Sequence, residues 1–397
     1  MNYTFSNRIQ NVKPSAIREI LKMTAQYPDI IALSTGSPSD EAIPVSEIRE
    51  ISQYIFENMA IPALQYSVTE GYPSLRAKTK ERLQTVFSIG RDFDDVIITS
   101  GGQQGLEIVP KVLCNEGDTV LVESPTFVSG INAIKSQGAN VIGLEMDEEG
   151  IRMDLLEEAV KTHSNVKLLY VIPTFQNPSG KTMSLARRRD IYDFCLKHHI
   201  IILEDNPYAE LRFRGEDIPT LKSMDHAGIV IYNGSYSKVI SAGMRIGFLC
   251  APTEIMERLI IAKQVGDCHT NIFFQIVTDL FLRNYDFNAH IKKIQNIYHH
   301  KCDLMLQSMD AQFDKRVSYT RPDGGLFLWC TLPEKYDSMD LARLCLDKGV
   351  AFVPGCSFMV DDTAPCPSFR LNYSTPSDDE LEKGISILSN AITEFLN

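Results

Sequence analysis

Short apolar runs alternate with longer amphipathic stretches through the middle of the chain. The runs are rich in β-branched residues, which is typical of strands buried on both faces of a sheet. They lie at 95–99, 119–123, 140–143, 167–172, 200–204 and 228–232, and stretches of helical character separate them at 103–114, 128–137 and 185–198. This alternation predicts an α/β fold in which helices cover a mostly parallel sheet.

The pattern changes after about residue 285. A long helical segment at 288–307 leads into a glycine-containing segment at 319–330, and strands and helices then alternate toward the C-terminus. A chain of 397 residues is also longer than one hydrophobic core usually supports. We therefore predict a second, smaller α/β domain in the C-terminal part.

Glycines or polar residues that could take part in binding or catalysis follow four of the predicted strands. Gly101 and Gly102 follow the first, Asn177 and Asp205 follow two others, and Lys238 follows the strand at 228–232. In parallel α/β sheets, ligands bind at the carboxyl ends of the strands. The sequence therefore predicts that these residues meet at one functional site.

The segment 234–248 carries the sharpest chemical signal. Lys238 stands among the hydroxyls of Ser235 and Ser237, and Arg245 follows in the same segment. Partial burial and nearby positive charge favour a neutral amine, which can form a Schiff base with an aldehyde. The hydroxyls and the guanidinium suit a phosphate group. Taken alone, the segment is more typical of a solvated lysine in a polar loop, and only the rest of the chain favours the reactive lysine.

Composition narrows the class of protein. The formal net charge is −12, with 44% hydrophobic and 23% charged residues, so we expect a globular protein with no nucleic-acid partner. No apolar run has the length of a membrane span, and the N-terminus lacks a signal-peptide pattern. Nine scattered cysteines without a CxxC motif, and histidines that occur as adjacent pairs, indicate neither disulfides nor a metal site. Reduced cysteines predict a cytoplasmic location.

From residue 7 to residue 374, these motifs come in an order that resembles the fold-type-I pyridoxal 5'-phosphate (PLP) enzymes, the class I/II aminotransferases. The similarity is closest to the branch of 2-aminoadipate and kynurenine aminotransferases. It implies a PLP cofactor, a large domain at 45–285 with a seven-stranded sheet, and a small domain at 286–397. It also implies an N-terminal arm at 1–44, which contributes to the small domain and the substrate site, and a homodimer with shared active sites.

The resemblance implies a role for each cofactor residue. Lys238 would hold PLP as an internal aldimine and then move a proton as general base and acid. Asp205 would keep the pyridine nitrogen protonated, and Asn177 and Tyr208 would donate to the phenolic oxygen. Phe127 would stack on the ring. The phosphate would be bound by the following residues: Gly102, Gln103, Ser235, Ser237, Arg245 and Tyr66 of the neighbouring subunit.

Two of these positions depart from the family, which often has serine at Gly102 and usually tyrosine at Phe127. Three of the proposed cofactor residues also have an ordinary structural interpretation. Asp205 suits a strand-end cap, Asn177 a turn, and Phe127 a core aromatic.

For the substrate, the resemblance implies that Arg370 binds the α-carboxylate, assisted by Gly36 and Asn177. Arg18 would meet a distal carboxylate, although its position on an amphipathic segment equally suits a solvated helix residue. A surface salt bridge is the ordinary interpretation of Arg370.

The predicted reaction is amino transfer between an α-amino acid and a 2-oxo acid such as 2-oxoglutarate. Candidate donors are glutamate, 2-aminoadipate and aromatic or apolar amino acids. Two alternatives stay open. One is another PLP chemistry on the same scaffold, such as a β-lyase or a cyclopropane-forming synthase. The other is the non-enzymatic PLP-sensing domain of a transcription regulator, which would require an N-terminal DNA-binding extension.

Overall fold

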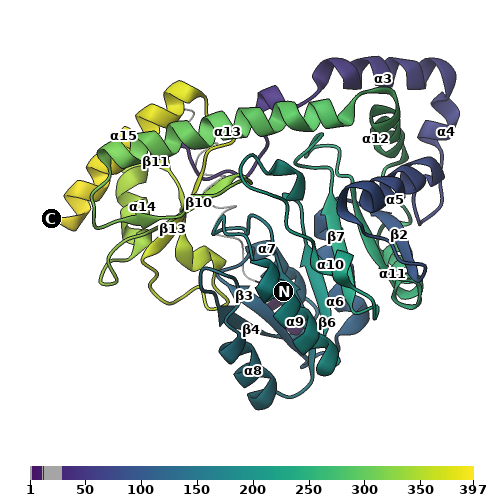
Figure 1. The fold of residues 1–397 in the computed structure, drawn as a ribbon, viewed down its shortest axis with the longest axis horizontal. Coiled ribbons are helices and arrows are strands. Elements are labelled where there is room, and N and C mark those ends of the chain that lie inside the picture. Colours follow the sequence, from purple (N-terminus) through teal and green to yellow (C-terminus); the bar gives the residue numbers. More distant parts are fainter. Residues whose placement is uncertain (1, 11, 13–28) are drawn as a thin grey trace.

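The computed structural model describes residues 2–10, 12 and 29–397, and a seven-stranded sheet organises the larger part of them (Figure 1). The strand order is β2-β8-β7-β6-β5-β3-β4. Strands β4, β3, β5, β6 and β7 pair in parallel, whereas β8 runs antiparallel to both β7 and β2. The predicted mostly parallel sheet of seven strands is confirmed. Its strands are β2 (Asp94–Thr99), β3 (Thr119–Ser124), β4 (Asn140–Glu145), β5 (Val166–Val171), β6 (Ile201–Asp205), β7 (Val230–Ser235) and β8 (Gly247–Pro252).

Both faces of this sheet are covered, which explains the continuous apolar runs. In β5, Leu168 and Tyr170 join one core cluster, while Leu169 and Val171 join the cluster on the opposite face. Helices α6 (Gly102–Leu113), α7 (Val128–Lys135) and α11 (Thr253–Asp267) cover the first face. Helices α8 (Met153–Thr162) and α9 (Leu185–Lys197) cover the second. Successive residues of a strand thus pack on opposite layers.

Helices also border the β2 edge of the sheet and connect it with the C-terminal part. Near the edge lie α3 (Val45–Asn58), α4 (Ala60–Leu64), α5 (Pro73–Phe87) and α12 (Ile272–Asn284). Helix α13 (Phe287–Gln312) runs from there toward the C-terminal part, where it lies beside α15 (Asp378–Leu396), as Figure 1 shows. None of the described helices is long and apolar enough to cross a membrane.

A second, four-stranded antiparallel sheet forms the core of the C-terminal part, in the order β12-β13-β10-β9. Its strands are β9 (Ser318–Tyr319), β10 (Phe327–Thr331), β12 (Val353–Pro354) and β13 (Ser368–Asn372), with α14 (Ser338–Asp347) nearby. The short strand β1 (Ile31–Ala32) pairs in parallel with β11 (Val350–Ala351), so N-terminal residues join this part. The smaller α/β unit is confirmed, while the boundaries 1–44, 45–285 and 286–397 stay a prediction.

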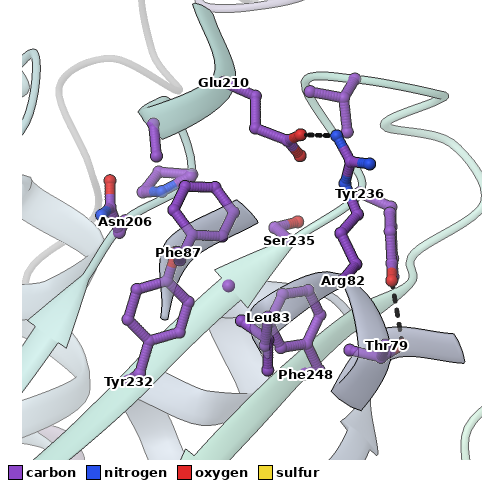
Figure 2. Close-up of a pocket in the computed structure, with 14 residues that line it drawn as sticks. Thr79, Arg82, Leu83, Phe87, Asn206, Glu210, Tyr232, Ser235, Tyr236 and Phe248 are labelled. Carbon is purple, nitrogen blue, oxygen red and sulfur yellow. Dashed lines mark hydrogen bonds and ion pairs between the residues drawn. The ribbon is translucent and has the colours of Figure 1, made fainter. Parts of the chain in front are cut away.

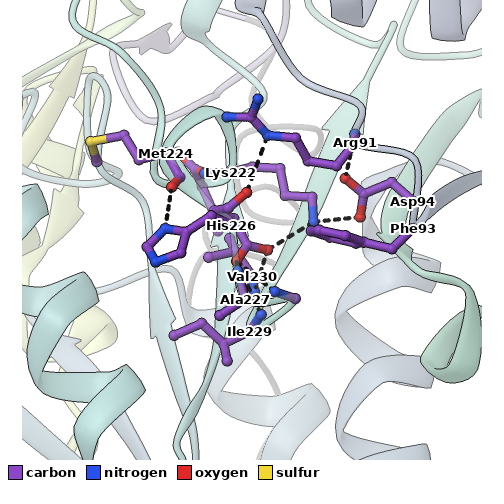
Figure 3. Close-up of polar contacts among 12 residues, drawn as sticks. Arg91, Phe93, Asp94, Lys222, Met224, His226, Ala227, Ile229 and Val230 are labelled. Atoms are coloured by element: carbon purple, nitrogen blue, oxygen red, sulfur yellow. Dashed lines mark hydrogen bonds and ion pairs between the residues drawn. The ribbon is translucent and has the colours of Figure 1, made fainter.

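A buried ion cluster fixes the sheet at the end opposite the carboxyl ends of its parallel strands (Figure 3). Lys222 of α10 (Leu221–Met224) donates to Asp94 at 2.7 Å and to Asp225 at 3.0 Å, and its side chain is fully buried. Asp225 also accepts from the backbone N–H of Val230, the first residue of β7. Because a buried charge is stable only when it is paired, this cluster constrains where β7 begins.

Candidate active site

A cavity of about 280 Å³ lies at the carboxyl ends of the central strands. All predicted site residues except Tyr66 and Arg18 line it. The full lining is Gly36, Gly102, Gln103, Leu106, Phe127, Asn177, Asp205, Pro207, Tyr208, Ser235, Ser237, Lys238, Ala242, Arg245, Phe327 and Arg370. The structure thus brings together residues that are distant in the sequence, as strand-end positions in a parallel sheet predict.

Lys238 presents its amine inside this cavity. Its Nζ donates to the backbone carbonyl of Gly36 at 2.6 Å. Burial, and then the positive charges of Arg370 and Arg245, lower the pKa of this amine to about 8. A substantial fraction is therefore neutral near physiological pH, which a nucleophilic amine requires.

The loop that carries Lys238 is fixed from behind. The hydroxyls of Ser235 and Ser237 share a hydrogen bond of 2.9 Å next to the cavity. Tyr236, between them, is buried on the other side, where its hydroxyl shares a 2.9 Å hydrogen bond with Thr79 of α5 (Figure 2). Successive side chains of this loop therefore point to opposite sides. The two serines face the cavity, and Tyr236 anchors the loop in the core.

The turn before α6 has the form of a phosphate cradle. Gly101 has a φ of 72°, and a Cβ there would lie 2.3 Å from Nη2 of Arg245. Helix α6 begins at Gly102, so its first backbone N–H groups and the positive end of its dipole are available to an anion. Asp267 accepts from the Ser100 hydroxyl at 2.7 Å and holds the turn. Together with Arg245 and the two serines, this end of the cavity fits a phosphate.

Asp205 ends β6 at another wall of the cavity and is almost fully buried. Its carboxylate accepts from the Tyr170 hydroxyl at 3.0 Å and from the Asn233 amide at 2.8 Å. Burial raises the pKa of this carboxyl to about 7, although both hydrogen bonds act to lower it. A buried carboxylate of this kind requires a positively charged partner, which a protonated pyridine nitrogen supplies.

The half-buried ring of Phe127 lines the same cavity. Amine, phosphate cradle, carboxylate and aromatic ring therefore fit PLP.

Arg370 is a buried residue of β13, so its ordinary interpretation as a surface salt bridge is wrong. Nη1 donates to Oδ1 of Asn177 at 2.8 Å, Nη2 donates to the Ser34 carbonyl at 2.8 Å, and the guanidinium lies 4.1 Å from the centre of the Phe327 ring. Nε has no hydrogen-bond partner among the described residues. Burial lowers the pKa of Arg370 to about 10, so the group remains charged at neutral pH. Such a guanidinium suits a carboxylate ligand.

Arg370 fixes Asn177 inside the cavity. Asn177 accepts from Arg370 and lines the cavity together with Tyr208. Burial raises the pKa of Tyr208 well above its usual range, so this phenol stays protonated and can donate. The Asn177 amide is therefore more than a turn former, because its oxygen accepts from Arg370 inside the cavity.

Two predicted residues are not among those that line the cavity. Tyr66 lies on the surface with 83% of its area exposed, and its ring meets His269 edge-on at 5.8 Å. Arg18 lies outside the residues that the structure describes.

Tyr170, Asn233 and Phe327 belong to the site or its support but were not among the residues predicted from the sequence. Tyr170 lies within an apolar strand and was indistinguishable from a core residue, and Phe327 reaches the cavity from the second sheet. Asn233 had a usable signal, because it is a polar residue near the carboxyl end of a buried strand, as Asp205 is.

Comparison with known proteins agrees with this geometry. The family model described as aminotransferase class I and II matches residues 28–388. The chain is 37% identical to aromatic-amino-acid aminotransferase 1 of Thermococcus litoralis, over 98% of this chain and 94% of that protein. It superimposes on the kynurenine aminotransferase of Pyrococcus horikoshii with a TM-score of 0.94 and 35% identity, covering 99% of this chain and 98% of the other. The α-aminoadipate aminotransferase of Thermus thermophilus, complexed with N-(5'-phosphopyridoxyl)-L-leucine, gives a TM-score of 0.91 and 34% identity, at 99% and 98% coverage.

Proposed function

The chain belongs to the class I and II aminotransferases and is a PLP-dependent transaminase of fold type I, and we propose the following substrates and residue roles for it. It transfers the amino group of glutamate, 2-aminoadipate and aromatic or apolar amino acids to 2-oxo acids such as 2-oxoglutarate. The relatives named for aromatic amino acids, kynurenine and α-aminoadipate support this range. The observation that carries the proposal is the convergence of Lys238, Asp205 and Arg370 on one cavity.

Lys238 binds the cofactor and later moves the proton. Bound PLP withdraws electrons from the substrate's α-carbon and makes its proton acidic. The Lys238 amine, whose pKa is lowered to about 8, takes that proton and holds it for return. The Gly36 carbonyl, 2.6 Å from Nζ, orients the amine.

The other cofactor residues bind PLP and adjust the electronic properties of its ring. Asp205 keeps the pyridine nitrogen protonated, and Asn177 and Tyr208 donate to the phenolic oxygen. Phe127 packs against the ring, which excludes water from that face. The phosphate is bound by the cradle residues Gly102, Gln103, Ser235, Ser237 and Arg245.

Arg370 orients the amino acid. Its buried guanidinium binds the α-carboxylate, with the Gly36 backbone and the Asn177 amide beside it. This fixes the α-carbon next to Lys238. We propose that Arg18 meets the distal carboxylate of dicarboxylic donors.

The protein acts as a homodimer in which Tyr66 reaches the phosphate of the partner subunit's cofactor. Support comes from a set of exposed apolar side chains on and around α4, since such residues are rarely left in water together. They are Phe56, Ile61, Leu64, Tyr66 and Val68.

We also propose a cytoplasmic location, because none of the nine cysteines forms a disulfide.

Product analysis tests the proposal. The protein is incubated with one amino acid, with and without 2-oxoglutarate, and the oxo acid formed is quantified. A transaminase forms about one oxo acid per bound cofactor without the acceptor and turns over only when the acceptor is present. Sustained product formation from the amino acid alone indicates a lyase and contradicts the proposal.

A further inference from the structure

The Asp205 carboxylate is held by two donors, and we propose that Tyr170 and Asn233 are positioning residues that keep it an anion directed into the cavity. The inference rests on the role proposed for Asp205. Neither donor lines the cavity, so each would act on the cofactor through Asp205.

The strand register brings the three side chains together. Asp205 of β6 pairs with Asn233 of β7, so the two side chains are neighbours on one face of the sheet. Tyr170 of β5 faces the same side and packs into the same cluster as Leu203 of β6. Tyr170 donates to Oδ2 at 3.0 Å and Asn233 donates to Oδ1 at 2.8 Å. Each carboxylate oxygen thus has its own donor, which fixes both the position and the rotation of the group.

Two helix glycines make room for these donors. A Cβ at Gly130 in α7 would lie 2.7 Å from Cε1 of Tyr170. A Cβ at Gly105 in α6 would lie 2.2 Å from Oδ1 of Asn233. Glycine is less favourable within a helix than any residue except proline, so its presence beside both donors needs a reason. The space required by Tyr170 and Asn233 supplies that reason.

Asn233 also links Asp205 to the phosphate cradle. Its Nδ2 donates to the Gly102 carbonyl at 3.1 Å as well as to Asp205. Its Oδ1 is buried and has no hydrogen-bond partner in the described part of the chain. An unpaired buried oxygen is unfavourable, so this orientation is maintained because both N–H donors are used. The Asn233 amide therefore connects the Asp205 end of the cofactor site with the phosphate end.

The surroundings of Asp205 make the donors necessary. Burial raises the pKa of its carboxyl, and the hydrogen bonds from Tyr170 and Asn233 lower it. Glu123, Tyr208 and Tyr232 also interact with its charge, and none of these three groups is positively charged. Without its donors, Asp205 would compete with the pyridine nitrogen for the proton, and the ring would lose its positive charge.

Two variants test this inference, Tyr170→Phe and Asn233→Ala. The protonation of the ring nitrogen is read from its ¹⁵N chemical shift in protein loaded with labelled PLP, and kcat and KM are measured separately. We expect each variant to lower kcat about 10- to 100-fold, the range for one hydrogen bond to a charged group. KM for the amino donor should stay within about twofold, because Arg370 is untouched. The ¹⁵N resonance should move toward that of neutral pyridine.

Tyr192→Phe is the matched control, because the Tyr192 hydroxyl also donates to a buried aspartate, Asp225, at 3.2 Å, away from the cavity. It should leave kcat and the ¹⁵N shift unchanged. If Tyr170→Phe also leaves both unchanged, the inference is wrong. If Tyr170→Phe does not fold, Asn233→Ala decides by the same criteria. Asp205→Ala, measured in parallel, distinguishes a failure of this inference from a failure of the proposed function. A wild-type kcat in that variant would refute the role of Asp205 itself.

Discussion

The lowered pKa of Lys238 can be measured in the protein before PLP is added. A pKa of about 8, in place of the usual 10.5, leaves about a quarter of the amine neutral near pH 7.5. An ordinary lysine has about one neutral amine in a thousand at that pH. The cavity therefore increases the reactive form of Lys238 by about two orders of magnitude, with burial as the larger cause and Arg370 and Arg245 as the smaller ones.

Replacing Arg370 separates these causes. Arg370→Gln removes one positive charge while burial and Arg245 remain, so the pKa of Lys238 should rise but stay below 10.5. Arg370→Lys keeps the charge and should leave the pKa near 8. The sign follows because a neighbouring cation disfavours the protonated amine, and its removal favours it.

Competitive acetylation measures the effect. The PLP-free protein is labelled with trace acetic anhydride over a range of pH, and the peptide containing Lys238 is quantified by mass spectrometry. The peptide with the exposed Lys161 serves as the reference for reagent decay. The labelling rate of Lys238 should level off above about pH 8. A midpoint near that of ordinary lysine, or an identical midpoint in Arg370→Gln, would refute the electrostatic reasoning.

Four further predictions concern other parts of the molecule. Asp205→Ala should lower turnover by orders of magnitude and Asp205→Glu by less, in steady-state kinetics; near-normal turnover in the alanine variant would exclude the proposed role. Lys222→Ala should lower the free energy of unfolding by about 3–5 kcal/mol in urea titrations, because it leaves two buried carboxylates without their cation, and a loss below about 1 kcal/mol would mean that the cluster is not needed. Tyr66→Phe should weaken PLP retention without changing the dimer mass in light scattering, and a fully active monomer would contradict shared sites. Arg18→Gln should raise KM for glutamate and 2-aminoadipate and leave apolar donors nearly unchanged; equal effects on both classes would remove Arg18 from side-chain recognition.

The strands of the large sheet were predictable because burial on both faces produces continuous apolar runs. The predicted strands at 95–99 and 119–123 match β2 and β3 within one residue. The helix predicted at 288–307 is too short, since α13 extends to Gln312. Met309 is the last buried apolar residue of this helix, and the residues after it are exposed, so the sequence gives little signal for where the helix ends.

The site was predictable where a polar residue ends an apolar strand, as Asp205 does, and where hydroxyls and charges gather just beyond a strand, as around Lys238. It was not predictable where the decisive feature depends on tertiary packing. Arg370 is buried by contacts with Asn177, the Ser34 carbonyl and the Phe327 ring, which local sequence does not encode, so its role was expected from the family resemblance alone. Tyr170 supplies one polar atom from within an apolar run, and only the strand register reveals its carboxylate partner.

Borohydride reduction tests the central claim most directly. The protein is loaded with PLP and reduced, and the modified peptide is identified by mass spectrometry. Lys263 is the informative competitor, because it is also a buried lysine with a lowered pKa, but its amine is bound by Asp267 at 2.8 Å. We expect the phosphopyridoxyl group on Lys238 alone. Its attachment to Lys263, or reduction that leaves no covalent adduct, would contradict the account.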